Sequence, residues 1–282
     1  MKEITLGDIR IGNGSPCVLI AGPCVIEDSA TTAAIAGGLK SLSEDLALPL
    51  IFKASYDKAN RTSKDSYRGP GMKEGLRILD EIKQEFEIPV LSDVHRFEEI
   101  DQAAQVLDII QIPAFLSRQT DFVTEVARTG SIVNIKKGQF LAPWDVAHIL
   151  DKALATGNDN ILITERGVSF GYNNLVADMC AIPIMRQYGY PVIFDATHSV
   201  QRPGGAGASS GGNRDMAVYL AKAATAVGID GLFLEVHYDP DCALCDGPNS
   251  LALASLPELL TIIKQIDGII KSSEDLEDSE YR

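Results

Sequence analysis

The chain has 282 residues, of which 45% are hydrophobic, and it carries a formal net charge of −14 at pH 7. This acidic balance argues against nucleic acids and anionic membrane surfaces as partners, because both attract basic proteins. Five cysteines, no basic-then-apolar leader and no apolar run of about 18 residues predict a cytoplasmic protein with reduced thiols and no membrane span.

The first predicted element is a β-hairpin. The segment ITLGDIRIGNG at 4–14 alternates apolar and polar residues around Gly7 and Asp8. Such alternation on both sides of a glycine-containing turn predicts two short antiparallel strands. We expect this hairpin, within residues 1–14, to close the bottom of the domain that follows.

Eight short apolar runs follow, and each has the composition of a strand that is buried on both faces. The predicted strands are residues 17–22, 50–56, 89–94, 109–114, 132–138, 161–167, 191–198 and 231–237. Segments with helical periodicity lie between them. Eightfold strand–helix alternation predicts an α/β fold with one (β/α)8 TIM barrel domain over residues 1–282, and a doubly wound open sheet is the alternative. We expect the acidic tail, 271–282, to fray.

Polar side chains stand near the carboxyl ends of all eight predicted strands, and in a barrel these ends converge on one mouth. They are Cys24, Lys53, Asp93, His95, Gln111, Lys136, Lys137, Arg166, His198, Glu235 and His237. An unpaired charge inside a buried strand is energetically costly. The pattern therefore predicts an active site at the mouth, with ion pairing inside the barrel as the alternative explanation for Lys136 and Arg166.

The segment FKASYDKANRTS at 52–63 concentrates cations in this acidic chain. The predicted cationic set is Lys53, Lys58, Arg61, Lys136 and Arg166, supported by the polar residues Asn60, Thr62, Ser63 and Gln111. Five cations exceed what one phosphate needs and indicate two anionic groups or two substrates. Arg118, at the start of a predicted helix, is a further candidate for binding phosphate, with a solvated surface arginine as the alternative.

A second set combines one thiol, one imidazole and two carboxylates, from Cys24, His198, Glu235 and Asp246. These donors suit a divalent transition metal. Cys242 and Cys245 form a single CxxC pair, which we interpret as loop cysteines because no second pair accompanies it. The glycine-rich segment 199–215 has the composition of a mobile cover over bound substrate.

Eight motifs, in collinear order over nearly the whole chain, resemble 3-deoxy-D-manno-octulosonate 8-phosphate synthase. They are KANRTS, SYRGPG, SDVH, IQIPAFLSRQTD, NIKKGQFLAPWD, TERGVSFGYNNLV, FDATHSVQRPGG and CDGPNSL. The resemblance implies a homotetrameric TIM barrel that condenses phosphoenolpyruvate with D-arabinose 5-phosphate and water, releases phosphate, and supplies lipopolysaccharide synthesis. The sister synthase that uses erythrose 4-phosphate typically has KPRTS in place of KANRTS. A non-catalytic sugar-phosphate-binding barrel is the alternative from a different class.

The resemblance also implies roles for individual residues. Phosphoenolpyruvate would contact Lys53, Lys58, Gln111, Lys136 and Arg166. Arabinose 5-phosphate would contact Asn60, Arg61, Thr62 and Arg118 of a neighbouring subunit, and Ser55 and Ala114 complete the substrate-binding set. The residues implied in catalysis are Lys58, Asp93, His95, Lys136, His198 and Asp246.

The cysteine in AGPC is typical of the metal-dependent type of this synthase. The resemblance implies Cys24, His198, Glu235 and Asp246 as ligands of zinc, iron(II) or manganese. The CDGP motif that contains Asp246 is instead typical of the metal-independent type.

Overall fold

The computed structural model describes residues 1–60, 63–204 and 211–280. Arg61 and Thr62 of the predicted sugar-phosphate strip lie outside the described residues, as does the 205–210 part of the predicted cover.

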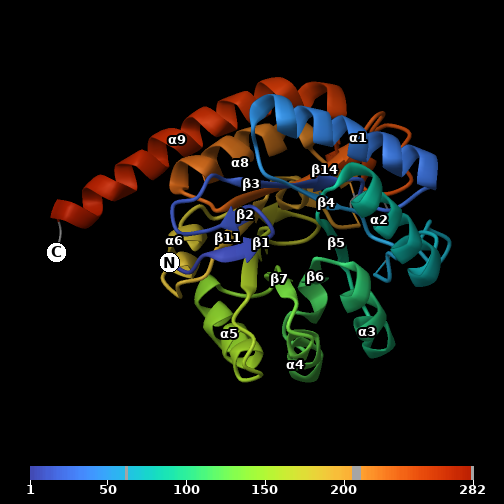
Figure 1. Cartoon of the computed structure of the whole chain (residues 1–282), viewed down its shortest axis with the longest axis horizontal. Helices are drawn as coiled ribbons and strands as arrows, with labels where there is room; N and C mark the ends of the chain where they lie inside the picture. Colours follow the sequence, from blue (N-terminus) through green and yellow to red (C-terminus); the bar gives the residue numbers. More distant parts are fainter. Residues whose placement is uncertain (61–62, 205–210, 281–282) are drawn as a thin grey trace.

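Eight parallel strands form a closed barrel, which confirms the predicted fold class (Figure 1). They are β3 (Val18–Gly22), β4 (Leu50–Lys53), β5 (Val90–Asp93), β6 (Ile109–Ile112), β7 (Ile132–Lys136), β8 (Ile161–Glu165), β11 (Val192–Asp195) and β14 (Gly231–His237). Each strand pairs with the next, and pairing of β11 with β14 closes the ring.

Helices follow the strands and surround the barrel (Figure 1). They are α1 (Ser29–Leu46), α2 (Met72–Phe86), α3 (Phe97–Val106), α4 (Thr120–Arg128), α5 (Val146–Leu154), α6 (Ala181–Arg186), α7 (Ala196–Ser199), α8 (Arg214–Val227) and α9 (Leu256–Glu280). α9 runs into the acidic tail, whose fraying stays a prediction. A search of the described helices finds no segment that combines the length and the apolar character needed to cross a membrane.

Shorter elements connect these parts. They are the strands β1 (Ile4–Leu6), β2 (Ile9–Ile11), β9 (Val168–Ser169), β10 (Leu175–Val176), β12 (Gln201–Arg202), β13 (Gly211–Gly212) and β15 (Leu251–Ala252), with 3-10 turns η1 (Ala114–Leu116), η2 (Pro143–Asp145), η3 (Gly247–Asn249) and η4 (Leu253–Ser255). β12 pairs with β13 at the base of the glycine-rich segment.

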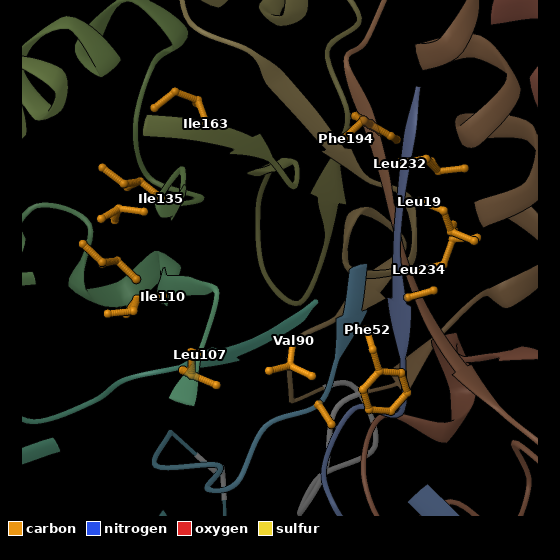
Figure 2. Packing of buried hydrophobic residues seen from close by; sticks show 14 of the residues in the cluster. Leu19, Phe52, Val90, Leu107, Ile110, Ile135, Ile163, Phe194, Leu232 and Leu234 are labelled. Carbon is orange, nitrogen blue, oxygen red and sulfur yellow. The ribbon is translucent and has the colours of Figure 1, made fainter. Parts of the chain in front are cut away.

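Strand side chains alternate between the outside and the inside of the barrel. The outer set packs with helix residues in one large hydrophobic cluster, and Figure 2 shows members such as Leu19, Phe52 and Phe194 around the ring of strands. The inner apolar set forms a second cluster of Val18, Ile20, Ile51, Leu91, Ile109, Ile132, Leu162, Ile193 and Phe233, together with Ile4 and Ile11. Since Ile4 and Ile11 belong to the antiparallel pair β1–β2, the hairpin closes the bottom of the barrel as expected.

The same alternation places polar residues at the mouth. Two residues beyond inward-facing Ile51 comes Lys53, two beyond Leu91 comes Asp93, and two beyond Ile109 comes Gln111. The inward face of these three strands is therefore apolar where the chain enters the barrel and polar where it leaves.

The seventh strand ends earlier than predicted. β11 stops at Asp195, and His198 lies in the one-turn helix α7. The Asp195 carboxylate accepts a hydrogen bond from the backbone N–H of His198 at 2.8 Å, so it caps this turn. The predicted strand 191–198 was therefore too long, because a capping aspartate turns the chain at its end.

Candidate active site at the barrel mouth

A cavity of about 350 Å³ occupies the mouth of the barrel. Eleven of the residues selected from the sequence line it: Lys53, Lys58, Asn60, Asp93, His95, Gln111, Ala114, Lys136, Arg166, His198 and Asp246. These residues come from the ends of seven different strands or the loops after them. The barrel thus brings most of the predicted site together.

Seven other selected residues within the described ranges do not line the cavity: Cys24, Ser55, Ser63, Arg118, Lys137, Glu235 and His237. Cys24, Ser55 and Glu235 are buried next to lining residues, as the contacts below show. Arg118 is exposed ahead of α4, and its carbonyl oxygen accepts a hydrogen bond from Lys152 Nζ at 3.0 Å.

Buried cations at the mouth pair with buried carboxylates. Lys53 Nζ lies 2.8 Å from Glu235 Oε1, and the two side chains are 1% and 0% exposed. Lys136 Nζ pairs with Asp195 and also lies 3.8 Å from the centre of the Phe233 ring. The ion pairing considered for Lys136 is therefore present, and Lys136 lines the cavity as well. Partnered charges of this kind avoid the cost of burying a lone ion.

Arg166 lines the cavity and has a hydrogen-bond donor that is not used within the described residues. Its Nη2 donates to Gln201 Oε1 at 3.0 Å, whereas its Nη1 has no hydrogen-bond partner among the described residues. A buried guanidinium nitrogen without an acceptor is costly, and an anionic ligand would supply one.

A chain of hydrogen bonds crosses neighbouring strands and ends at Asp93. The Thr164 hydroxyl donates to Asn134 at 2.7 Å, and the Asn134 amide donates to Gln111 at 2.8 Å. Gln111 Nε2 and the Ser55 hydroxyl both donate to Asp93. Because each member is held by its neighbour, Gln111 and Asp93 have fixed orientations at the cavity wall.

The surroundings of Asp93 and His95 set their charges. Burial would raise the pKa of Asp93, but the Lys53 and Lys58 ammonium groups hold it well below its ordinary value. Burial lowers the pKa of His95 despite the nearby Asp93 carboxylate. At neutral pH Asp93 is therefore ionised, and the His95 imidazole is neutral.

Asp195 organises two functional side chains at once. It accepts a hydrogen bond from Lys136 Nζ, and its Oδ2 lies 2.7 Å from His198 Nδ1. Burial would raise the pKa of Asp195, but the charges of His198 and Lys136 hold it below its ordinary value. With Nδ1 engaged by the carboxylate, the other ring nitrogen of His198 is directed at Glu235 and Asp246, 3.6 and 3.5 Å away.

The four predicted metal ligands lie together. Besides the His198 contacts, Cys24 Sγ is 3.4 Å from Asp246 Oδ2. Burial raises the pKa of Cys24 well above its ordinary value, and the neighbouring Cys245 and Asp246 raise it further. Single ligand atoms of Cys24, Cys245 and Asp246 all lie within 4.8 Å of one another, so these three residues could also hold a metal ion.

Cys245 corrects the interpretation of the CxxC pair. Cys242 is exposed, as expected for a loop cysteine, whereas Cys245 is 4% exposed, lines the cavity and places its sulfur 2.8 Å from that of Cys24. The sequence signal that could have identified it is its position directly before Asp246.

Comparison with known proteins matches this chain to one family. The family model described as "DAHP synthetase I family" matches residues 1–272. The chain belongs to this family.

Curated relatives within the DAHP synthetase I family carry a more specific name. A protein from Geotalea uraniireducens (strain Rf4) and one from Geotalea daltonii are each 61% identical over 271 residues, which covers 96% of this chain and all of theirs. A Geobacter metallireducens protein is 60% identical over 270 residues, covering 96% of this chain and 99% of its own. All three are named 2-dehydro-3-deoxyphosphooctonate aldolase.

The resemblance implies a divalent metal in this DAHP synthetase I family member, and the donor set fits one. Thiol, imidazole and carboxylate donors are the types that bind zinc, iron(II) and manganese. Glu235 Oε2 is buried and has no hydrogen-bond partner among the described residues, so it is available to a cation. Cys24, His198, Glu235 and Asp246 are the donors that the resemblance implies, and Cys24 and Asp246 also belong to the cluster with Cys245.

The pairing of Asp195 predicts a pH-dependent loss of stability in Asp195→Asn. Removing one partner of a buried ion pair costs about 3–5 kcal/mol. The folded pKa of Asp195 lies below its unfolded value of about 3.9, so its contribution is complete above that pH and is lost as the pH falls below it. Denaturant unfolding should therefore show that the difference in free energy of unfolding between parent and variant is largest near neutral pH and becomes smaller below about pH 4.

Asp8→Asn, in the exposed turn of the hairpin, is the control and should change the free energy of unfolding by less than about 0.5 kcal/mol. A gap between parent and Asp195→Asn that stays constant from pH 7 to pH 3 would contradict the assigned pairing.

Proposed function

We propose that the protein condenses phosphoenolpyruvate with D-arabinose 5-phosphate and water, giving 3-deoxy-D-manno-octulosonate 8-phosphate and phosphate for lipopolysaccharide synthesis. The observation that carries this proposal is the convergence of Lys53, Lys58, Lys136 and Arg166 on one cavity, in a chain with a net charge of −14. Such a concentration of cations makes the cavity locally positive in a protein whose net charge is negative, and this suits the binding of two phosphorylated substrates. The name shared by relatives at 60–61% identity supports the same reaction.

Phosphoenolpyruvate would occupy the deeper part of the cavity. Lys53, Lys136 and Arg166 are 1%, 6% and 5% exposed, and Gln111 is fixed beside them by the hydrogen-bond chain. Buried cations that are already in place bind a carboxylate and a phosphate without much side-chain reorganisation.

Arabinose 5-phosphate would enter from the outer side, where Asn60 is exposed at the cavity rim. Arg61 and Thr62 would continue this contact. Arg118 is exposed and does not line the cavity of its own chain, so it is free to contact the sugar phosphate of a neighbouring subunit in a tetramer. Phe115, three residues earlier, lines the cavity and is 53% exposed, so an adjoining subunit would also cover an apolar side chain.

The reaction requires one new carbon–carbon bond and three proton movements. C3 of phosphoenolpyruvate bonds to the aldehyde carbon of the sugar, and the aldehyde oxygen takes a proton. Water then adds at C2 and gives up one proton, which leaves a hydroxyl group there. Phosphate leaves with its bridging oxygen, the proton of this hydroxyl passes to the phosphate, and C2 becomes a ketone. Asp93, ionised, and His95, neutral, are the groups at the cavity wall that can move these protons.

The cations stabilise the charge that changes during these steps. Lys58 lies 2.9 Å from the Ser55 hydroxyl and lines the cavity beside Asp93. Lys136 is held by Asp195, which also orients His198. A metal held by Cys24, His198, Glu235 and Asp246 would act as a Lewis acid for a substrate oxygen. We propose the metal-dependent type, with zinc, iron(II) or manganese as the ion, in a cytoplasmic homotetramer.

Substrate choice gives the first test of this function. Asn60 replaces the proline that is typical of the sister synthase, so we expect phosphate release to be faster with arabinose 5-phosphate than with erythrose 4-phosphate. The difference in kcat/KM should be at least tenfold, which corresponds to about 1.4 kcal/mol in transition-state binding. Equal values for both sugars would reject the assignment, and phosphate release with neither would favour a non-catalytic binding protein.

Assembly gives the second test. Arg118→Ala should raise the KM for arabinose 5-phosphate about 10- to 100-fold, because a charge-assisted hydrogen bond contributes about 1.5–3 kcal/mol. The KM for phosphoenolpyruvate should change less than about twofold. Arg128→Ala is the matched control, since Arg128 is an exposed arginine that pairs with Glu125 on the same helix. Full activity of a monomer verified by light scattering would refute the shared site.

Metal removal gives the third test. A chelator should abolish phosphate release by the parent protein, and added divalent metal should restore it. Cys24→Ala should retain less than about 1% of the rate, because the remaining donors cannot replace the thiolate. Cys24→Asn should keep partial activity that the chelator does not affect, since an amide can hydrogen-bond to the groups that the metal otherwise organises.

Cys17→Ala serves as control, because Cys17 is a buried thiol that precedes β3 at the opposite end of the barrel. Undiminished turnover by rigorously metal-stripped parent protein would show that Cys24 is a packing residue and that no metal is needed.

A further inference from the structure

Two cysteines that are 221 residues apart in sequence meet at the mouth. Cys24 follows β3, and Cys245 lies between β14 and η3. Their sulfur atoms are 2.8 Å apart, and both side chains are 4% exposed. A disulfide bond is about 2.05 Å long, so a small approach of the two sulfurs is sufficient to form one.

One of the two thiols can be reached from the cavity. Cys245 lines the cavity together with Ala243 and Leu244, whereas Cys24 is not among the residues that line it. A reagent small enough to enter the substrate cavity would therefore meet Cys245 first. The surrounding loop also contains the exposed Cys242, whose thiol donates to Asp239 Oδ2 at 3.2 Å.

We propose that Cys24 and Cys245 form a reversible disulfide, and that this bond and the catalytic metal exclude one another. The oxidant is a low-molecular-weight disulfide such as oxidised glutathione. The Cys245 thiolate attacks one sulfur of the reagent, forms a mixed disulfide and releases one small thiol. The Cys24 thiolate then attacks Sγ of Cys245 and releases the second small thiol. The protein loses two electrons and two protons, and the reagent gains them.

The exclusion follows from the place of Cys24 in the metal set, and this part rests on the proposed function. Cys24 Sγ lies 3.4 Å from Asp246 Oδ2, and Asp246 directly follows Cys245. A sulfur that is bonded to Cys245 no longer offers a thiolate, and a thiolate bound to a metal is not available for attack. Oxidation would therefore trap the metal-free protein in an inactive form that a small thiol reverses.

The test exposes the full-length protein to oxidised glutathione, once metal-free and once loaded with zinc. Intact mass and mapping of protease-derived peptides report the product without reference to activity. We expect the metal-free parent to lose two hydrogens, with the peptides of Cys24 and Cys245 linked, and the zinc-loaded parent to react at least tenfold more slowly. Dithiothreitol should reverse the change and restore zinc binding, as measured with a colorimetric zinc indicator.

Two variants separate the thiols. Cys242→Ser should form the same link at the same rate, whereas Cys245→Ser should form no internal disulfide and should keep binding zinc after the treatment. A link between Cys242 and Cys245, or glutathione adducts without an internal bond, would overturn the proposal. Equal rates of disulfide formation with and without zinc would show that the disulfide and the metal do not exclude one another. Phosphate release by the reduced protein, measured separately, keeps a failure of this inference distinct from a failure of the proposed function.

Discussion

The mouth of this barrel depends on the pairing of charges that are buried inside it. Lys53 with Glu235, Lys136 with Asp195 and Lys137 with Glu165 each join residues from different strands or strand ends. A lone ion at any of these positions would cost several kcal/mol. The pairs therefore keep cations and carboxylates together at the mouth of the barrel, and those two kinds of group are what anionic substrates and a metal require.

The alternation of strand side chains explains why such a polar layer can exist in a stable protein. Inward positions near the strand starts form the apolar cluster around Ile20 and Phe233, which the hairpin residues Ile4 and Ile11 cover. The next inward positions carry the polar groups. One apolar layer thus supports the polar layer above it. The hydrogen-bond chain from Thr164 through Asp93 to Ser55 connects five neighbouring strands or strand ends within that layer.

The sequence predicted the barrel and most of its mouth, because apolar strand runs and the polar residues at their ends are local signals. Contacts between residues that are far apart in the sequence were harder to predict. The turn at Asp195 depends on a side-chain cap, so His198 was placed in a strand instead of in α7. Cys245 was interpreted only as a loop cysteine, since nothing local to a CxxC pair shows that its sulfur lies 2.8 Å from the sulfur of Cys24. The proposed role of Arg118 involves a neighbouring subunit, and the sequence of one chain suggests it only through resemblance.

We propose that the mouth binds a metal on one side and phosphoenolpyruvate among its cations on the other. A crystal structure of the protein with cobalt(II) and phosphoenolpyruvate, recorded with anomalous scattering from cobalt, tests it most directly. We expect one strong anomalous peak among Cys24, His198, Glu235 and Asp246, with the phosphoenolpyruvate anion in contact with Lys53, Lys136 and Arg166. A cobalt peak elsewhere, or phosphoenolpyruvate bound outside this cavity, would contradict the account.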